Sequence, residues 1–271
     1  MTTSLMEPPA RRPATRPVWR PLGSAVTVLV LLVTGLATWA LFSPRRTEDQ
    51  TYTYRQAIDQ VELDTSEGDI TVVAGEPGVA VVAQRLSWTS MARPAVDRSV
   101  TGERLAVAGE CRGTGGPFRF GGHCAIGFTV QVPPEVTVKV HTGGGTVRIA
   151  GLTGEVRVTA ATGDIQLDDL AGAVVVRADH SDVTATGLRA GAVDVRIQSG
   201  DLDLAFARPA PAVVVATRAG DVTLELAPGR YQVSARSDAG QETVEVPHDP
   251  GASSTVTART GAGDVVIRYA D

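Results

Sequence analysis

A short unit of alternating apolar and polar residues recurs along the second half of this chain. In VRVTAATGDIQLDDLAGA, residues 156–173, two such runs flank a turn at Gly163-Asp164. The stretches VVVRADHSDVTATGLRAGA and VDVRIQSGDLDLAF follow the same plan. A repeat of this kind constrains the fold strongly, because every unit must adopt the same local structure and bury the same face.

The turns set the register of the repeat. Most turns contain a glycine followed by an aspartate, and Ser181 replaces the glycine once. The turn glycines are Gly145, Gly163, Gly200, Gly220, Gly240 and Gly263, and together with Ser181 they are separated by steps of 18, 18, 19, 20, 20 and 23 residues. The aspartates are Asp164, Asp182, Asp201 and Asp221, with Asp69 and Asp264 in matching turns.

Apolar residues occupy equivalent places on both sides of the turns. Before the turns they are Val138/Val140, Val156/Val158, Val174/Val176, Val193/Val195, Val213/Val215, Tyr231/Val233 and Val256/Ala258. After most turns they are Val147/Ile149, Ile165/Leu167, Val183/Ala185, Leu202/Leu204, Val222/Leu224 and Val265/Ile267, with Val244/Val246 displaced in the sixth unit. A further apolar column comprises Leu152, Leu170, Leu188 and Phe206.

A period of two inside a period of about 19 residues is typical of stacked coils, in which each coil adds a strand to each of two or more sheets. Hydrophobic residues make up 43% of the chain but aromatic residues only 4%, which favours thin layers of Val, Leu, Ile and Ala. We therefore predict an all-β fold: a β-solenoid, or single-stranded parallel β-helix, of roughly seven to eight short coils. An antiparallel β-sandwich is the alternative, although it requires no fixed period.

A first coil is expected near residue 58, because apolar pairs flank a turn at Gly68-Asp69. The pattern then breaks over residues 79–133, where the longer runs VAVVAQRLSW, ERLAVAGEC and AIGFTVQV share no register. An inserted β-hairpin region would cover the open edge of the terminal coil. We therefore predict a first coil and a β-hairpin cap over residues 58–136, and the solenoid repeats over residues 137–271.

The N-terminal region has a different composition. Residues 1–20 are rich in Pro and Arg and are predicted to form a disordered basic tail. Residues 22–42 carry no charge, and a helix of this length spans about 30 Å, the thickness of the hydrocarbon core of a bilayer. We predict a transmembrane signal-anchor helix over residues 21–43 and a linker over residues 44–57.

Flanking charges orient this helix. Four arginines precede it, so the positive-inside rule places the N-terminus in the cytoplasm and the remainder of the chain outside the cell membrane. The predicted location is the cell membrane, as a single-pass protein with an extracytoplasmic C-terminal domain. A cleavable signal peptide, with Thr38-Trp39-Ala40 as a weak cleavage site, is the alternative.

Charge argues against nucleic acid as a partner. Residues 47–271 contain 19 basic and 29 acidic residues, a net charge of −10. The sequence shows no basic stripe in this acidic region, which is the feature expected of a nucleic-acid-binding surface.

The two cysteines of the chain, Cys111 and Cys124, flank the glycine-rich stretch CRGTGGPFRFGGHC. Disulfides persist outside the membrane, so we predict a bridge between them. The alternative is a metal site with His123 and His141, although His123 is adjacent to Cys124 and joint tetrahedral ligation would be awkward. Phe118 and Phe120 in the loop are candidates for a binding tip or for burial beneath the bridge.

Stacked coils would bring the repeated aspartates to about 4.8 Å from one another, where two unit charges in water repel by about 0.9 kcal/mol. In the structural interpretation, glycine supplies a positive φ angle and each carboxylate accepts backbone N–H bonds in its own turn. In the other interpretation, a row of Ca²⁺ ions lies between the coils. The chain lacks the GGxGxD nonapeptide of calcium-binding repeats, so we favour the structural interpretation and predict no metal and no cofactor.

A catalytic interpretation has candidates on spacing alone. Some polysaccharide-cleaving enzymes are β-helices with aligned carboxylates, and Asp201/Asp203 and Asp168/Asp169 have suitable spacing. Such sites usually add aromatic platforms, but Trp88 is the only tryptophan after the predicted anchor. The four histidines lie in separate segments, and no nucleophile, zinc or phosphate-loop motif is present. We therefore predict that the protein is not an enzyme.

The repeated turns (ATGD, DHSD, QSGD, RAGD and GAGD), the VPPEVTVKV stretch that begins the repeat and the APGRYQVSARSDAG segment resemble a family of bacterial envelope proteins. This is the putative-adhesin family, whose β-solenoid domain has no known function. The resemblance also includes the paired cysteines and covers about residues 55–270. It implies a surface-exposed, non-enzymatic protein, in some cases near envelope-stress signalling systems, and it assigns no catalytic residues.

The chain is thus predicted to be a membrane-anchored, extracytoplasmic β-solenoid that acts as an adhesin or as an interaction surface of the cell envelope. Its expected partners are the membrane and an envelope polymer or protein, and the sequence predicts no oligomeric state. Two alternatives stay open. One is an accessory or sensor of an envelope-stress signalling system, acting through the loop near the cysteines. The other is a polysaccharide-active β-helix enzyme.

Overall fold

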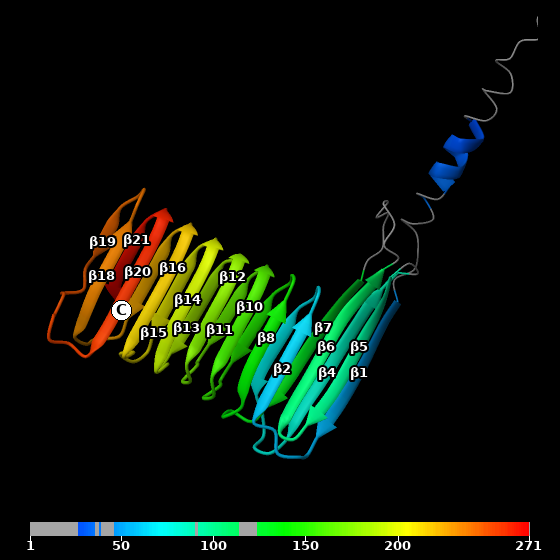
Figure 1. The fold of residues 1–271 in the computed structure, drawn as a ribbon, viewed down its shortest axis with the longest axis horizontal. Coiled ribbons are helices and arrows are strands. Elements are labelled where there is room, and N and C mark those ends of the chain that lie inside the picture. Colours follow the sequence, from blue (N-terminus) through cyan, green and yellow to red (C-terminus); the bar gives the residue numbers. More distant parts are fainter. Residues whose placement is uncertain (1–26, 36–37, 39–45, 90–91, 114–123, 271) are drawn as a thin grey trace, which may run out of the picture. The chain divides into compact units, whose positions relative to one another are not determined.

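The structure is a computed structural model that describes residues 27–35, 38, 46–89, 92–113 and 124–270 (Figure 1). The chain divides into two units. The first contains the helical residues 27–35 and 38, and the second contains 21 strands. The repeat lies wholly in the second unit.

Most of the predicted N-terminal features lie outside the described residues. This holds for the disordered tail over residues 1–20 and for much of the transmembrane helix over residues 21–43. In the short helical segment that is described, the side chains of residues 28–33 are apolar and exposed. No helix in the described part of the chain has both the length and the apolar character needed to cross a membrane.

Sheet A contains 11 strands. They are β1 (Arg46–Tyr54), β3 (Ile70–Ala74), β4 (Ala80–Trp88), β7 (Cys124–Val132), β9 (Val147–Ala150), β11 (Ile165–Asp168), β13 (Val183–Leu188), β15 (Leu202–Phe206), β17 (Val222–Leu226), β19 (Glu242–Val244) and β21 (Val265–Tyr269). Their order across the sheet is β1-β4-β7-β3-β9-β11-β13-β15-β17-β21-β19.

Sheet B contains 10 strands. They are β2 (Gln60–Thr65), β5 (Ala92–Thr101), β6 (Arg104–Gly113), β8 (Thr137–Thr142), β10 (Val156–Thr162), β12 (Val174–His180), β14 (Ala192–Ser199), β16 (Ala212–Ala219), β18 (Tyr231–Ser237) and β20 (Ser254–Ala262). Their order is β18-β20-β16-β14-β12-β10-β8-β2-β6-β5.

Each repeat supplies one strand to sheet B and the next strand to sheet A, and equivalent strands of neighbouring repeats pair in parallel (Figure 1). The predicted apolar columns are in register: Val156 lies between Val138 and Val174, and the inward side chains of both sheets form one buried cluster. The column of Leu152, Leu170, Leu188 and Phe206 is buried as well. An all-β, solenoid-like fold is therefore confirmed. The parallel ladders exclude the antiparallel sandwich.

The last two repeats exchange places in the stack. Sheet B runs β16-β20-β18 and sheet A runs β17-β21-β19, so the final coil lies between its two predecessors. The sixth unit is therefore the terminal coil. Its irregular sequence follows from this position, because strand β19 has no neighbour on its outer side and is exposed along its whole length.

The register of this terminal coil differs from the prediction by two residues. Val233 and Ala235 align with Val256 and Ala258, whereas the sequence pattern had placed Tyr231 and Val233 there. Tyr231 is instead fully buried, and its hydroxyl donates to the backbone oxygen of Ala227 at 2.6 Å. Burial is the main reason why the pKa of Tyr231 is raised above its ordinary value.

The N-terminal end shows a similar exchange. The first coil, β2/β3, lies between β8/β9 and an additional coil formed by β6 and β7. With this coil, the described residues form nine two-stranded coils, more than the roughly seven to eight predicted. The additional coil was missed because its strands, of 10 and 9 residues, are longer than most strands of the repeat. The segment between them, residues 114–123, also interrupts the period.

Antiparallel strands cover this end. β5 forms a hairpin with β6, β4 pairs with β7, and β1 pairs with β4, although β1 falls within the predicted linker over residues 44–57. The buried Gln84 on β4 donates to Gln50 at 2.9 Å and accepts from Arg98 at 2.7 Å. The Arg98 guanidinium stacks 3.6 Å from the centre of the Tyr52 ring. A polar network therefore joins three strands where the apolar core ends.

The exchanged order at the C-terminal end can be tested with engineered disulfides. Val214 on β16 lies beside Thr257 on β20, which separates it from Ser234 on β18. Neighbouring strands are about 4.8 Å apart, a Cα separation that a disulfide can span. We expect the variant Val214→Cys/Thr257→Cys to form a second disulfide on oxidation, detected by peptide mass spectrometry.

The matched control is Val214→Cys/Ser234→Cys, in which β20 lies between the two cysteines. This variant should stay reduced at the new positions. A disulfide in the control and none in the first variant would show that the coils stack in chain order.

Candidate functional site

The turns predicted from the sequence lie over one another in successive coils and form one continuous edge of the stack, which we call the corner. The turn glycines have positive φ angles, for example 128° at Gly200 and 137° at Gly220. A Cβ atom at Gly220 would overlap the carbonyl oxygen of Gly200 in the coil beneath it, and a Cβ at Gly263 would overlap that of Gly220. Glycine is therefore required for its conformation and also for the close approach of stacked backbones. Ser181 is the exception, since its φ is not positive and it is buried.

The aspartates bind the next coil. Asp182 Oδ1 accepts a hydrogen bond from the Asp201 backbone N–H at 2.9 Å, and Asp201 Oδ1 accepts one from Asp221 N–H at 2.8 Å. Asp221 binds Asp264 N–H in the same way, and Asp264 binds Gln241 N–H, both at 2.8 Å. At the other end of the column, Asp69 binds Thr146 N–H at 2.8 Å. These bonds follow the exchanged order of the coils.

We call this series of hydrogen bonds from backbone N–H groups to aspartate carboxylates the aspartate ladder. It corrects the predicted role of the aspartates in one respect. Each carboxylate was expected to bind N–H groups of its own turn, but its partner lies in the neighbouring coil, so the side chains join coils together. The charge-assisted bonds offset the repulsion between stacked carboxylates. Asp164 occupies the same place in the column, although its carboxylate accepts no hydrogen bond from the described residues.

Three of the four carboxylates considered for catalysis are engaged by a neighbour. Asp201 belongs to the ladder, Asp168 accepts from the Thr186 hydroxyl at 2.7 Å, and Asp169 forms an ion pair with Arg189. Asp203 is exposed on the outer face of β15. Within the described ranges, no group of three or more His, Cys, Asp or Glu side chains is placed to hold a metal ion.

The predicted disulfide is present. Cys111 on β6 and Cys124 on β7 are bonded, with their Cα atoms 5.9 Å apart. The bridge therefore joins sheet B to sheet A within the additional coil. Phe118, Phe120 and His123 lie outside the described residues, and His141 is exposed on β8.

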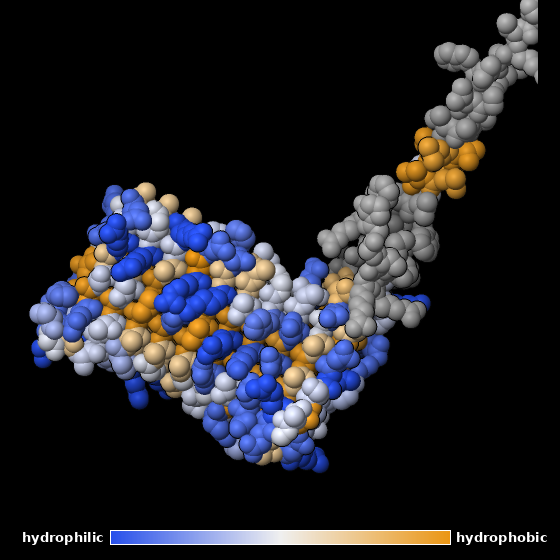
Figure 2. Space-filling model, viewed as in Figure 1, coloured by the Kyte–Doolittle hydropathy of each residue, from blue (hydrophilic) through white to orange (hydrophobic). Residues whose placement is uncertain are grey.

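No pattern in the sequence indicated a concave surface on sheet B. A groove with a volume of about 670 Å³ lies over strands β2, β8, β10, β12, β14 and β16, lined in part by His141, Arg177, Arg196 and Arg218. Arg218 also lines a neighbouring hollow of about 430 Å³ together with Arg236 and Arg259. Figure 2 shows hydrophilic side chains standing among exposed apolar ones over the repeat. The absence of a basic stripe in the sequence was therefore misleading, because the arginines come from five separate repeats.

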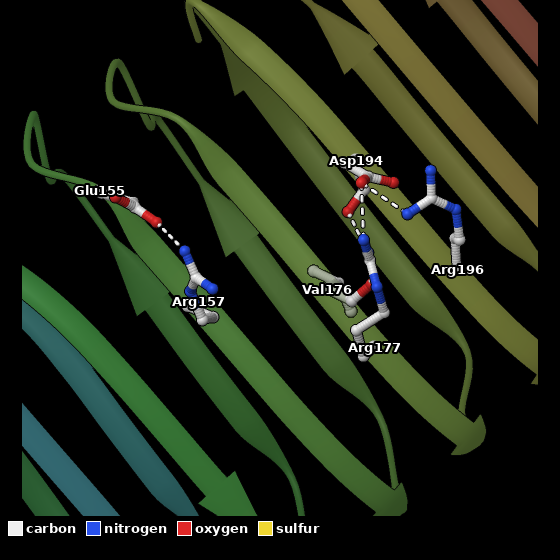
Figure 3. Close-up of polar contacts among 6 residues, drawn as sticks. All are labelled: Glu155, Arg157, Val176, Arg177, Asp194 and Arg196. Atoms are coloured by element: carbon white, nitrogen blue, oxygen red, sulfur yellow. Dashed lines mark hydrogen bonds and ion pairs between the residues drawn. The ribbon is translucent and has the colours of Figure 1, made fainter.

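The arginines at one end of the groove converge on a single acid (Figure 3). Arg177 and Arg196 contact the same carboxylate oxygen, Asp194 Oδ2, at 2.6 and 2.7 Å. Arg177 also donates to the backbone oxygens of Val176 and Asp194 at 2.8 and 2.9 Å. On the neighbouring strand β10, Arg157 is paired with Glu155 at 2.6 Å. Both guanidinium groups at Asp194 are therefore fixed in position.

A family model, Toastrack DUF4097, matches residues 130–269, just over half of the chain. The chain belongs to the Toastrack DUF4097 family. The match covers strands β8 to β21 and the end of β7, and it leaves out β1 to β6. No curated protein sequence matches the chain significantly.

Several solved structures are similar in fold. One is described as a putative cell adhesion protein from Clostridium sporogenes, with 11% identity, a TM-score of 0.43, and coverage of 83% of this chain and 100% of that one. Others are described as putative adhesins from Parabacteroides distasonis (14% identity, TM-score 0.41, covering 83% and 97%) and Bacteroides fragilis (12%, 0.39, covering 81% and 97%). At these identities and TM-scores, no property of this chain follows from the likeness.

The requirement for glycine at the corner predicts a large loss of stability on substitution. Gly220→Ala places a methyl group against the Gly200 carbonyl at a φ of 137°. We expect a loss of about 3 kcal/mol or more in the free energy of unfolding, measured by urea denaturation. Gly191→Ala is the matched control, since nothing lies within 4 Å of a Cβ there. It should change stability by less than about 0.5 kcal/mol. Equal effects would contradict the close stacking.

The ladder predicts that an acceptor, and not a charge, is needed at each aspartate. Asp201→Ala removes the acceptor for Asp221 N–H and should cost about 1 kcal/mol in unfolding free energy. Asp201→Asn keeps an acceptor oxygen and relieves repulsion with Asp182 and Asp221, so it should stay within about 0.5 kcal/mol of the parent. The melting temperature should not respond to calcium or to a chelator. A rise with calcium that Asp201→Asn abolishes would favour the calcium interpretation.

Proposed function

We propose that this chain is a single-pass, membrane-anchored extracytoplasmic protein whose solenoid-like domain is a non-enzymatic interaction surface of the cell envelope. The observation that carries the proposal is that one set of side chains in the domain stabilises the fold and a separate set is free to contact a partner. Inward residues and corner residues are committed to the architecture, whereas the outward residues of both sheets differ from coil to coil.

The outer faces support this role through their variety. On sheet B the aligned outward positions are Glu62, Lys139, Arg157, Val175, Asp194, Val214, Thr257 and Ser234. A change at such a position leaves the core intact, so the surface can adapt to a partner without loss of the fold. The groove on sheet B gives this surface a concave region of a size suited to a ligand.

The membrane anchor is supported by the sequence. Residues 22–42 carry no charge, and arginines precede them. In a bacterial host we expect a cysteine placed at Thr2 to react with a membrane-impermeant maleimide only after lysis. A cysteine appended after Asp271 should react in intact spheroplasts. Loss of the N-terminal segment from the mature protein, seen by mass spectrometry, would identify a cleaved signal peptide instead of an anchor.

Binding without turnover distinguishes an interaction surface from an enzyme. The purified full chain should sediment with isolated envelope fragments and release no soluble sugar or phosphate from them. Product release that is abolished in Asp168→Asn or Asp201→Asn would contradict the proposal and support the polysaccharide-active alternative. Failure to sediment with envelope material under any salt condition would contradict the interaction itself.

A further inference from the structure

We propose that the groove on sheet B binds a linear anionic glycan through a row of arginines, an inference that rests on the proposed function and names its partner. The arginine row comprises Arg177 on β12, Arg196 on β14, Arg218 on β16, Arg259 on β20 and Arg236 on β18. These are five consecutive strands of sheet B, each with one arginine on its outer side.

The register of the sheet aligns this row. Arg177 pairs with Arg196, and Arg196 pairs with Ala216. Ala216 pairs with Arg259, which pairs with Arg236. Arg218 lies two residues after Ala216 on the same strand, so β16 also contributes to the row. With strands about 4.8 Å apart, the five arginines extend over about 19 Å at right angles to the strands.

Positive charge is in excess along the row. Arg177 and Arg196 share one carboxylate, that of Asp194, and Arg236 pairs with Asp238 at 2.9 Å. Within the described residues, Arg218 and Arg259 form no ion pair, and both are exposed. Like charges on neighbouring strands are destabilising. Five arginines on consecutive strands, in a region with a net charge of −10, therefore point to a ligand that carries negative charge.

The surface beneath the arginines is concave and lacks aromatic residues. The groove is lined by several small residues, including Ala161, Ala178 and Ala216. Thr217 and Arg218 line both the groove and the neighbouring hollow beside Arg259. No Phe, Tyr or Trp is among the described residues that line either hollow. Proteins that bind single-stranded nucleic acid stack its bases on aromatic side chains. The groove offers no such side chain, which argues against nucleic acid as the ligand.

These features specify the ligand chemistry. A guanidinium group binds carboxylate or phosphate through two parallel hydrogen bonds. A row of such groups over about 19 Å fits a linear polymer that carries an oxyanion on each repeat. Thr and Gln side chains along the groove, such as Thr159 and Gln198, can hydrogen-bond to sugar hydroxyls between the charges. The carboxylate of a uronic acid and a phosphate ester on a sugar meet this requirement equally.

The test measures binding of the full chain to four polymers: polygalacturonate for carboxylate, phosphorylated dextran for phosphate, neutral dextran and an oligodeoxythymidylate. We expect the chain to bind at least one of the two anionic glycans, more weakly as salt rises, and to ignore neutral dextran. Tighter binding to the oligonucleotide than to either glycan would overturn the proposed ligand class.

Substitutions locate the site. Arg218→Gln/Arg259→Gln removes the two arginines without ion pairs and should weaken glycan binding by about tenfold or more. Arg148→Gln/Arg208→Gln is the matched control, because it removes two charges from exposed positions outside the row. It should change binding by less than about twofold. Equal weakening in both variants would show a general charge effect and overturn the site.

A lysine variant and a stability measurement distinguish the loss of the arginine contacts from a loss of charge or of the fold. Arg218→Lys/Arg259→Lys retains the charge but not the paired hydrogen bonds, so its affinity should lie between those of the parent and the Gln variant. Urea denaturation should show no lower midpoint for any variant, because the changed side chains are exposed. If neither anionic glycan binds while the chain still sediments with envelope fragments, this inference fails and the proposed function stands. If the chain binds nothing, both fail.

Discussion

The structure depends on how closely neighbouring coils approach at one corner. There the backbone at each turn glycine passes directly over a carbonyl group of the coil beneath, in a space that admits no Cβ atom, and Ser181 is the one exception among the described turns. This contact sets the rise of the stack and keeps the Val and Ile columns of both sheets in register. The aspartate ladder reinforces the same corner, because each bond runs from one coil to the next. The acidic corner is thus part of the architecture.

Because the residues of the core and the corner are needed for the fold, only the outward residues of the two sheets are free to vary. On sheet A the outward residues are mostly uncharged, as in Thr71, Thr184 and Thr223. On sheet B they include five arginines on consecutive strands, four of them in register, which line a groove and the hollow beside it. A domain that is acidic as a whole therefore carries a local surface of opposite charge, and local charge governs which ligands bind there.

The repeat made much of this fold predictable from sequence. Alternation identified the inward residues, and the spacing of Gly163, Gly200 and Gly220 identified the corner. The order of the coils could not be predicted, because β18 and β20 present equivalent edges and only their packing decides which is internal. The arginine row was missed for a related reason. Arg259 becomes the neighbour of Ala216 only when the last coil is inserted out of order, and Arg218 occupies a different position in its repeat.

The most direct measurement is a scalar coupling across the hydrogen bonds of the ladder, observed by NMR on protein labelled with ¹⁵N and ¹³C. The account predicts a correlation between the backbone ¹⁵N of Asp221 and the side-chain ¹³Cγ of Asp201, and a second between Asp264 ¹⁵N and Asp221 ¹³Cγ. The second also reports the exchanged coil order. Correlations confined to a single turn, or rapid solvent exchange of both amides, would contradict the account.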